Sequence, residues 1–327
     1  MESLARSLPA RPSFTLVCVL AALAVAAIPA AAVLAQPGAI PFVVVETGRG
    51  FTSLQQAVRA IGDGRGTIAI APGTYRQCAV QEAGEVTYLA SEPGTVVFEN
   101  TTCEGKAALV LRGRAARVSG LTFRGISVPD LNGAGIRLEQ GDLTVAQSWF
   151  SDSQQGILTG SDPKGTIVID KSTFSGLGNC EDPSGCAHSV YVGKYGSLRV
   201  TRSRFERGTG GHYLKARAAR VEVAASSFDD SAGRGTNYMI DLPEGSTGQI
   251  TNNWFVQGAD KENYSTFIAV AAEDGSQSAD GLTIAGNDAR FAPDVRRSSA
   301  FVADWSGDKL AVGPNALGTG LKPFEKR

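Results

Sequence analysis

A phenylalanine returns at the same place in a series of short alternating segments between residues 118 and 255. The six residues are Phe123, Phe150, Phe174, Phe205, Phe228 and Phe255, at intervals of 27, 24, 31, 23 and 27 residues. A repeat of this length built from short strands is typical of a parallel β-solenoid, in which each turn buries its apolar face only against its neighbours. Other all-β folds also space short strands regularly, but they would not keep an aromatic residue in the same phase. We therefore predict an all-β solenoid with the phenylalanines stacked inside.

A second short strand follows each phenylalanine. Its alignment from turn to turn predicts one inward-facing column, namely Ile136, Ile157, Val190, Leu214, Met239 and Phe267. Successive side chains of a strand point to opposite faces. The following residues are therefore predicted to point outward, namely Arg137, Leu158, Tyr191, Lys215, Ile240 and Ile268. On the same count Asp241 has the inward parity of Met239.

Residues 51–61 differ from the repeat and have the pattern of a short amphipathic helix. Thr52 or Ser53 is its candidate N-cap, and its apolar face comprises Leu54, Ala57, Val58 and Ile61. A solenoid exposes an apolar end and unpaired sheet edges, which such a helix can cover.

This helix and the segment Ile68–Tyr75 that follows it resemble the N-terminal cap and first turn of right-handed parallel β-helix proteins of the pectate-lyase-like superfamily. The resemblance extends over residues 51–310. It implies a right-handed parallel β-helix, with residues 36–112 as cap and first turns, 113–310 as further turns and 311–327 as a C-terminal tail. The superfamily contains polysaccharide lyases, glycoside hydrolases, uronate epimerases, esterases and non-enzymatic surface proteins. The sequence lacks the calcium-binding aspartate clusters of pectate lyases and the Asp-Pro-His-Asp motif of alginate epimerases, so we assign no metal, no cofactor and no catalytic residue by motif.

Residues 1–35 have the pattern of an export signal. Arg6 and Arg11 precede an apolar run over residues 14–28, and Val33-Leu34-Ala35 offers a cleavage site after Ala35. An uncleaved membrane anchor is the alternative. We expect a periplasmic or secreted monomer without stable membrane insertion after cleavage.

Four cysteines remain after residue 35, namely Cys78, Cys103, Cys180 and Cys186. An even number in an oxidising compartment predicts two disulfides. A bridge between Cys180 and Cys186 would close a short loop, and one between Cys78 and Cys103 would join neighbouring turns. Four free buried thiols are the alternative, and no histidine lies at zinc-finger spacing.

The charge of the chain is unevenly distributed. Residues 1–35 carry Glu2, Arg6 and Arg11, so the rest of the chain holds 29 basic and 31 acidic side chains. Residues 194–220 contain eight of the basic residues against one acidic residue, namely Lys194, Arg199, Arg202, Arg204, Arg207, Lys215, Arg217 and Arg220 against Glu206. A basic band favours an anionic partner. Stacking aromatic residues are sparse in this band, which argues against nucleic acid, so we expect an acidic polysaccharide. An ordinary solvated face is the alternative.

The two histidines of the chain, His188 and His212, are 24 positions apart and occupy the same place in successive repeats. In a solenoid they would stack beside Tyr191, Lys215 and Arg217. Strand parity points the imidazoles inward, but a turn at the start of a strand can redirect them.

This cluster suggests a lyase or an epimerase. A β-elimination on a uronide needs a base for the C5 proton, a cation for the carboxylate and an acid for the leaving oxygen. Lys215 or a histidine is the candidate base, Arg217 the cation and Tyr191 the acid. C5 epimerisation would use the same groups. The candidate substrate-binding residues are Tyr213, Tyr238, Arg199 and Asp241.

Simpler explanations exist for these residues. Either histidine can be a buried side chain bonded to a turn carbonyl, Tyr191 and Lys215 can be a surface pair, and Asp241 can cap a turn. A non-catalytic glycan-binding or envelope protein is therefore the second hypothesis. A glycoside hydrolase is the third, and it would pair Asp241 with Asp229 or Asp230.

Overall fold

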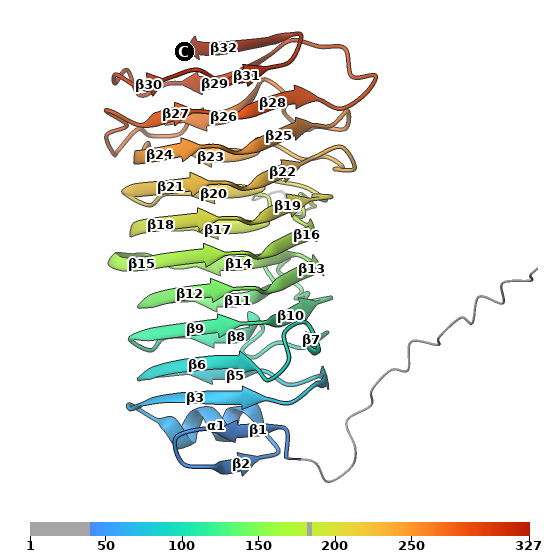
Figure 1. Cartoon of the computed structure of the whole chain (residues 1–327), viewed down its shortest axis with the longest axis vertical. Helices are drawn as coiled ribbons and strands as arrows, with labels where there is room; N and C mark the ends of the chain where they lie inside the picture. The colour runs from blue at the N-terminus through green and yellow to red at the C-terminus, as the bar shows by residue number, and fades with distance from the viewer. Residues whose placement is uncertain (1–39, 182–184) are drawn as a thin grey trace, which may run out of the picture. The chain divides into compact units, whose positions relative to one another are not determined.

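A computed structural model, which describes residues 40–181 and 185–327, shows a parallel β-helix built from three sheets (Figure 1). The predicted fold class, and the parallel β-helix that the family resemblance implies, are therefore confirmed. The export signal predicted for residues 1–35 lies outside the described residues. Among those residues, no α-helix is long and apolar enough to span a bilayer.

Each turn contributes one strand to each sheet, and the strands of successive turns pair in parallel. Sheet A begins with the antiparallel pair β2 (Arg49–Phe51) and β1 (Phe42–Val44) and continues with β3 (Arg65–Ile70), β6 (Glu85–Ala90), β9 (Ala115–Ser119), β12 (Asp142–Ala146), β15 (Asp162–Asp170), β18 (Tyr195–Thr201), β21 (Arg220–Ala224), β24 (Thr247–Thr251), β27 (Thr283–Ala285) and β30 (Ala311–Val312). Sheet B comprises β4 (Gly73–Tyr75), β7 (Val96–Glu99), β10 (Leu121–Arg124), β13 (Trp149–Ser153), β16 (Thr173–Leu177), β19 (Arg204–Glu206), β22 (Ser227–Asp229), β25 (Trp254–Gln257), β28 (Asp288–Phe291) and β31 (Ala316–Leu317).

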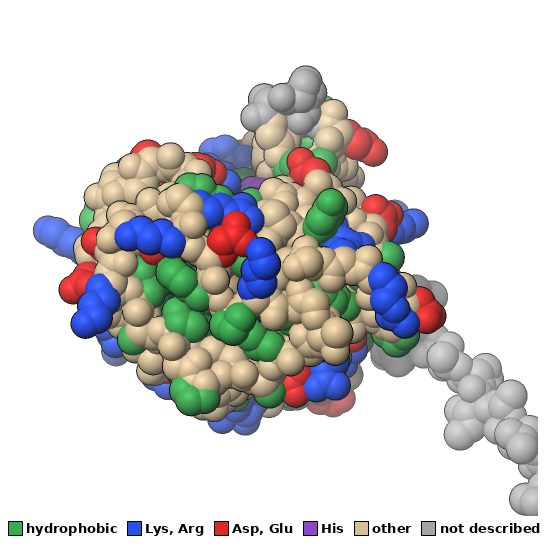
Figure 2. Space-filling view, turned by 90° about the horizontal axis from the view of Figure 1, so that it is seen from above, with side chains coloured by type: hydrophobic (Ala, Val, Ile, Leu, Met, Phe, Trp, Pro, Cys, Tyr) green, Lys and Arg blue, Asp and Glu red, His purple; other side chains and the backbone are tan. Residues whose placement is uncertain are grey.

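Sheet C comprises β5 (Ala79–Gln81), β8 (Ala107–Leu111), β11 (Ala134–Leu138), β14 (Gln155–Thr159), β17 (Val190–Val192), β20 (Leu214–Ala216), β23 (Ile240–Leu242), β26 (Thr266–Val270), β29 (Ser299–Asp304) and β32 (Leu321–Lys326). Residues 311–327, expected as a tail, therefore add one more strand to each sheet. Figure 2 looks onto this C-terminal end, where apolar side chains are visible among charged ones. Phe324 of β32 is 40% exposed there.

The predicted phenylalanine column is confirmed. From Phe123 to Phe255 the rings of sheet B stack with centroids 4.7 to 5.0 Å apart. Phe98 and Tyr75 extend the column towards the N-terminus. Burial of a phenylalanine side chain stabilises a fold by about 1.5–3 kcal/mol, so this stack supplies a large part of the core.

Each turn has three strands rather than the two expected, because the stretch before each phenylalanine bends. The bend lies at a residue with positive φ, such as Gln147 (48°), Lys171 (48°) or Ala225 (49°). This conformation costs a non-glycine residue roughly 1–2 kcal/mol. The polar residue that follows offsets the cost, because its side chain accepts a backbone N–H from the turn before. Examples are Ser148 N to Ser172 Oγ at 3.3 Å and Ser226 N to Asn253 Oδ1 at 2.9 Å.

The predicted helix is α1 (Leu54–Ile61), and it lies at the N-terminal end of the solenoid (Figure 1). Leu54, Ala57 and Val58 are buried, as its apolar face requires. Ser53 is the N-cap residue but its side chain makes no capping bond. Instead Gln77 Oε1 accepts a hydrogen bond from the Leu54 N–H at 3.0 Å, which satisfies one free donor of the first turn.

Both predicted disulfides are present, between Cys78 and Cys103 and between Cys180 and Cys186. The first joins cysteines 25 positions apart in the sequence, and the second joins cysteines six positions apart.

The inward column of sheet C differs from the prediction in its last two positions. Val190 pairs with Leu214, Leu214 with Ile240, and Ile240 with Ile268. Met239 and Phe267 are therefore not the aligned residues, although both are buried. The turn before β23 is one residue longer than assumed, and a slip of one residue exchanges the two faces of a strand. Asp241 consequently follows Lys215 in the outward column, where Ile240 was expected.

Candidate functional site

The outward column of sheet C brings three of the predicted residues together. Tyr191 of β17 pairs with Lys215 of β20, and Lys215 pairs with Asp241 of β23. Lys215 Nζ lies 3.4 Å from Asp241 Oδ2. The prediction that Asp241 points inward is therefore wrong, and the corrected register places its carboxylate beside the lysine.

A loop after β26 adds a carboxylate that the sequence did not reveal. Glu273 Oε1 accepts from Lys215 Nζ and Glu273 Oε2 from Arg217 Nη2, each at 2.5 Å. Partial burial alone would raise the pKa of Glu273, but the hydrogen bonds from the two cations outweigh burial and hold that pKa below its usual range. The Glu273 side chain remains 44% exposed. Lys215 and Arg217 thus form a fork that holds one surface carboxylate.

Arg217 links this fork to Tyr191. Its Nε donates to Tyr191 Oη at 3.0 Å, and its Nη1 donates to Glu244 Oε1 at 3.1 Å. Glu244 is almost fully buried and also contacts Lys194 Nζ at 3.1 Å. Arg217 is therefore oriented by three partners, and the tyrosine oxygen receives a charged hydrogen bond, which is roughly twice as strong as a neutral one.

The two histidines stack as predicted, with ring centroids 4.9 Å apart. His188 Nδ1 accepts the backbone N–H of His212 at 3.0 Å. Because a backbone N–H can only donate, His188 in its neutral form must carry its proton on Nε2. Burial, followed by the positive charge of Lys215, lowers the pKa of His188 to about 3. His188 is thus a neutral donor whose basic nitrogen is already occupied.

His212 faces the carboxylate of Asp241. Its Nε2 lies 3.3 Å from Asp241 Oδ2. Burial, followed by the charge on neighbouring cations, lowers the pKa of His212 well below its usual range, and burial raises the pKa of Asp241 to about 6. Asp241 Oδ1 is buried and finds no hydrogen-bond partner among the described residues. Asp241 is therefore the member of this pair that can take up or release a proton near pH 6, and His212 stays neutral there.

Both imidazoles lie on the outer side of sheet C rather than in the core. His188 contacts the ring of outward-facing Tyr191, with centroids 5.7 Å apart, and His212 contacts outward-facing Asp241. The turn at the start of each strand redirects the side chains, against their parity. Tyr238 extends the stack on the far side of His212, at 5.4 Å.

Two other candidate substrate-binding residues lie away from this cluster. Tyr213 is 1% exposed, and its hydroxyl donates to Asp230 Oδ1 at 2.7 Å, so its side chain is closed to a substrate. Arg199 belongs to β18 of sheet A and pairs with Glu222 at 3.4 Å.

The basic band does not form one face. Its 27 residues correspond to about one turn of the solenoid, so Arg220 lies on sheet A, Arg204 on sheet B and Lys215 on sheet C. Several of its cations are also paired with acidic residues distant in sequence, as in Arg202 with Asp170 at 2.6 Å and Arg207 with Asp152 at 3.2 Å. The basic residues that are close in sequence are therefore distributed around one turn of the solenoid, where most of them form ion pairs.

Asp230, a candidate partner of Asp241 in a hydrolase, has a structural place. It is fully buried, with Lys261 Nζ 3.2 Å from its Oδ2. Asp230 Oδ1 accepts from the hydroxyls of Thr236 and Tyr213 at 2.6 and 2.7 Å. A buried carboxylate with this many donors holds two turns together and is closed to substrate.

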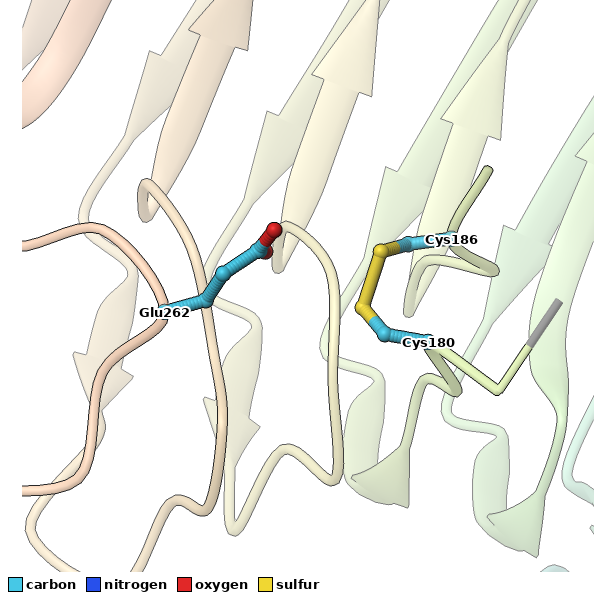
Figure 3. A group of neighbouring side chains, drawn as sticks. All are labelled: Cys180, Cys186 and Glu262. Atoms are coloured by element: carbon cyan, nitrogen blue, oxygen red, sulfur yellow. A yellow bond between two sulfur atoms is a disulfide. The ribbon is translucent and has the colours of Figure 1, made fainter. Parts of the chain in front are cut away.

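Among the described residues, one group of side chains has the spacing of a metal site, namely Cys180, Cys186 and Glu262 (Figure 3). The two sulfurs are joined to each other, as the figure shows, and a metal ligand must be a thiolate. This group therefore does not fit a metal ion.

No protein-family model and no curated protein matches the sequence. Two solved structures share the fold, each with a TM-score of 0.52, 14% identity and coverage of 83% of this chain. One is the alginate lyase from Paenibacillus sp. str. FPU-7, of which 94% is covered. The other is ORF18 of Geobacillus virus E2; this chain spans 55% of its length. At this identity the likeness shows the fold alone, which is a parallel β-helix.

Proposed function

We propose that this protein binds an acidic polysaccharide along sheet C and acts on its uronic-acid residues by β-elimination or C5 epimerisation. The observation that carries the proposal is the pair of ion pairs on the Glu273 carboxylate. Lys215 Nζ and Arg217 Nη2 each lie 2.5 Å from one of its oxygens. Two cations on one face already bind a carboxylate in the manner that a uronate requires. Glu273 is partly exposed, so an incoming uronate can displace it.

The reaction uses this fork to stabilise negative charge. A base removes the proton at C5, and the electron pair forms the C4–C5 double bond as the C4–O4 bond breaks. The leaving oxygen then takes up a proton. Arg217 and Lys215, on the substrate carboxylate, stabilise the anion that develops next to it. In epimerisation the same anion is reprotonated at C5 from the opposite face, and no bond to oxygen breaks.

Two sets of groups remain to move the protons. Tyr191 Oη, held at 3.0 Å by Arg217 Nε, is one. The pair of His212 and Asp241 is the other, because burial raises the pKa of the Asp241 carboxyl to about 6 and its Oδ2 lies 3.3 Å from His212 Nε2. Lys215, with two carboxylates on its nitrogen, is assigned the neutralising role rather than that of the base. His188 is assigned a positioning role, because its Nδ1 is occupied.

A glycoside hydrolase is the second candidate, and the carboxylates around Lys215 favour it. Asp241, with a pKa of about 6, is suited to protonate a leaving group, while ionised Glu273 is suited to act as base or nucleophile. The two carboxylates contact the same nitrogen, at 3.4 and 2.5 Å, so both lie beside Lys215.

The deciding experiment incubates the purified protein with a panel of uronic-acid polymers. Unsaturated product, followed by its ultraviolet absorbance, indicates a lyase, whereas exchange of the C5 proton with deuterated solvent without cleavage indicates an epimerase. New reducing ends without unsaturation would support the hydrolase instead. Binding with none of these reactions would support a non-catalytic glycan-binding protein.

Variants of Tyr191 and Arg217 test the catalytic roles assigned to these residues. Tyr191→Phe is expected to lower turnover by about 10²-fold or more, the usual scale for an acid–base group. Arg217→Gln is expected to lower it by about 10²-fold, the usual scale for a group that stabilises developing negative charge. Arg199→Gln, a matched change on sheet A, is expected to keep full turnover. If Tyr191→Phe and Arg217→Gln also keep it, the assignment is wrong.

We further infer that the protein is exported, since its two disulfides suit an oxidising compartment. A monomeric state and the absence of nucleic acid among its partners stay predictions.

A further inference from the structure

A pocket of about 380 Å³ lies beside Tyr191, towards the N-terminal turns. Its walls include Lys106, Asp130, Asn132, Arg137, Leu158 and Tyr191. Arg137 pairs with Leu158 on the next strand, and Leu158 pairs with Tyr191. The pocket therefore continues the outward column that carries Lys215 and Asp241.

Arg137 is the cation of this pocket without a committed acceptor. Its Nε is buried and has no hydrogen-bond partner among the described residues. The carboxylate that pairs with it, Glu139, stays 4.0 Å away. Glu139 is engaged elsewhere, because it accepts from Lys106 Nζ at 2.7 Å and Arg112 Nε at 2.6 Å. A guanidinium whose donors lack acceptors is unfavourable in the folded protein, and an anion bound in the pocket would supply acceptors to the exposed part of the group.

Two cations near Arg137, Arg112 and Lys106, are by contrast fully paired with carboxylates. Arg112 contacts three carboxylates, those of Glu82, Glu104 and Glu139, at 3.1 Å or less. Lys106 contacts Glu104 and Glu139, at 3.2 and 2.7 Å. Of the cations that line the pocket, Arg137 alone can offer its planar fork of donors to a ligand, among the residues that the structure describes.

We propose that Arg137 forms an anion-binding subsite for the carboxylate of a second uronic-acid residue on the same polysaccharide chain. The inference rests on the proposed function and extends it. Adjacent strands lie about 4.8 Å apart, so Arg137 stands roughly 10 Å from Tyr191 along the column. A linear chain of pyranose rings laid along the solenoid advances by about one ring per strand. Arg137 therefore meets a carboxylate two or three residues from the sugar at Lys215 and Arg217.

The pocket has one acidic wall, which suits a sugar rather than an isolated anion. Asp130 Oδ1 accepts the Asn132 N–H at 3.2 Å, and its other oxygen is left to accept sugar hydroxyls. The combination of one free guanidinium and one carboxylate thus matches a uronate, which carries both an acid group and hydroxyls.

Oligo-uronates of increasing length test the subsite. Their affinities are measured by calorimetry in a Tyr191→Phe background, so that the ligand survives the titration. We expect a hexa-uronate to bind more tightly than a di-uronate, and Arg137→Gln to weaken the hexa-uronate at least tenfold while leaving the di-uronate within twofold. The matched control is Arg117→Gln, an exposed arginine of sheet A.

The possible results separate the subsite from the reaction. Unchanged hexa-uronate affinity in Arg137→Gln, or an equal loss for both lengths, overturns the subsite and leaves the reaction standing. Length-dependent binding that needs Arg137, in a protein that turns over no polymer, supports the subsite and rejects the proposed reaction. If the protein binds no oligo-uronate of any length, both proposals are overturned.

Discussion

Lys215 and Asp241 are direct neighbours on adjacent strands of sheet C, with Nζ 3.4 Å from Oδ2. The contact joins a cation to a carboxylate whose pKa burial raises and the charge of Lys215 lowers. Glu273 contacts Lys215 and His212 contacts Asp241, while Arg217 joins the cluster through Glu273. Most of the expected behaviour of the site follows from this arrangement.

Removal of Glu273 should strengthen the binding of acidic substrate. In Glu273→Gln the fork of Lys215 and Arg217 no longer holds an internal carboxylate, so a uronate meets no competitor. We expect the Kd for a uronic-acid polymer to fall by about three- to tenfold, a change of up to ~1.4 kcal/mol. Glu222→Gln, on sheet A, should leave Kd unchanged. A weaker complex in Glu273→Gln would show that Glu273 contacts the substrate instead.

The pH dependence of the protein's stability should reflect the raised pKa of Asp241. Its pKa is about 6 in the folded state against 3.8 for the unconstrained group. The folded state therefore holds the proton more tightly, and this contribution to stability is full below pH 4 and is lost as the pH rises through 6. Two pKa units correspond to about 3 kcal/mol. Asp241→Asn removes this pH-dependent contribution. Between pH 4 and 7, the free energy of unfolding from denaturant titrations should therefore rise more with pH in the variant than in the wild type.

His188 should change the pH dependence of stability in the direction opposite to Asp241. Its pKa is about 3 in the folded state against 6.5 for the free side chain. The unfolded state binds the proton more tightly, so this contribution is present above pH 6.5 and is lost as the pH falls towards 3. His188→Phe keeps a stacking ring but leaves the His212 N–H without its acceptor, and we expect a loss of about 1–3 kcal/mol at pH 7. Turnover per folded molecule should stay within a few-fold of the wild type, and a complete loss would make His188 a proton carrier.

The phenylalanine column should dominate the stability of the fold. Phe174 stacks between Phe150 and Phe205 at 4.8 Å on each side and is fully buried. Phe174→Ala should cost about 3–5 kcal/mol. Trp149→Ala, a change of an aromatic residue that is 51% exposed on sheet B, should stay within about 0.5 kcal/mol. Urea unfolding of the two variants compares these values directly.

The fold was predictable because its main signal is periodic. The repeated phenylalanine indicates the solenoid, and the cysteine spacings indicate the disulfides. The bend before each phenylalanine was not visible, because residues such as Gln147 and Ala225 adopt positive φ without being glycine. Their only mark in the sequence is the serine or asparagine that follows.

The site was predictable only in part. Tyr191, Lys215 and Arg217 follow from alternation within strands whose alignment is unambiguous. Asp241 was named as a candidate but was predicted to point inward, because two apolar residues, Met239 and Ile240, both suit the inward position and the pattern cannot choose between them. Glu273 and Glu244 were missed because they come from connections between strands, where no period applies. Glu273 meets Lys215 across 58 positions of sequence.

The length of the connection before β23 determines which residue of that strand stands beside Lys215. Insertions and deletions in such connections, more than substitutions, therefore control what this surface can do. A single residue added between β22 and β23 would bring Ile240 beside Lys215 and turn the aspartate away, with every residue of the site still present in the sequence. Relatives of this chain with an identical set of polar residues can thus differ in chemistry through connection length alone. Comparisons made by residue identity would not detect the change.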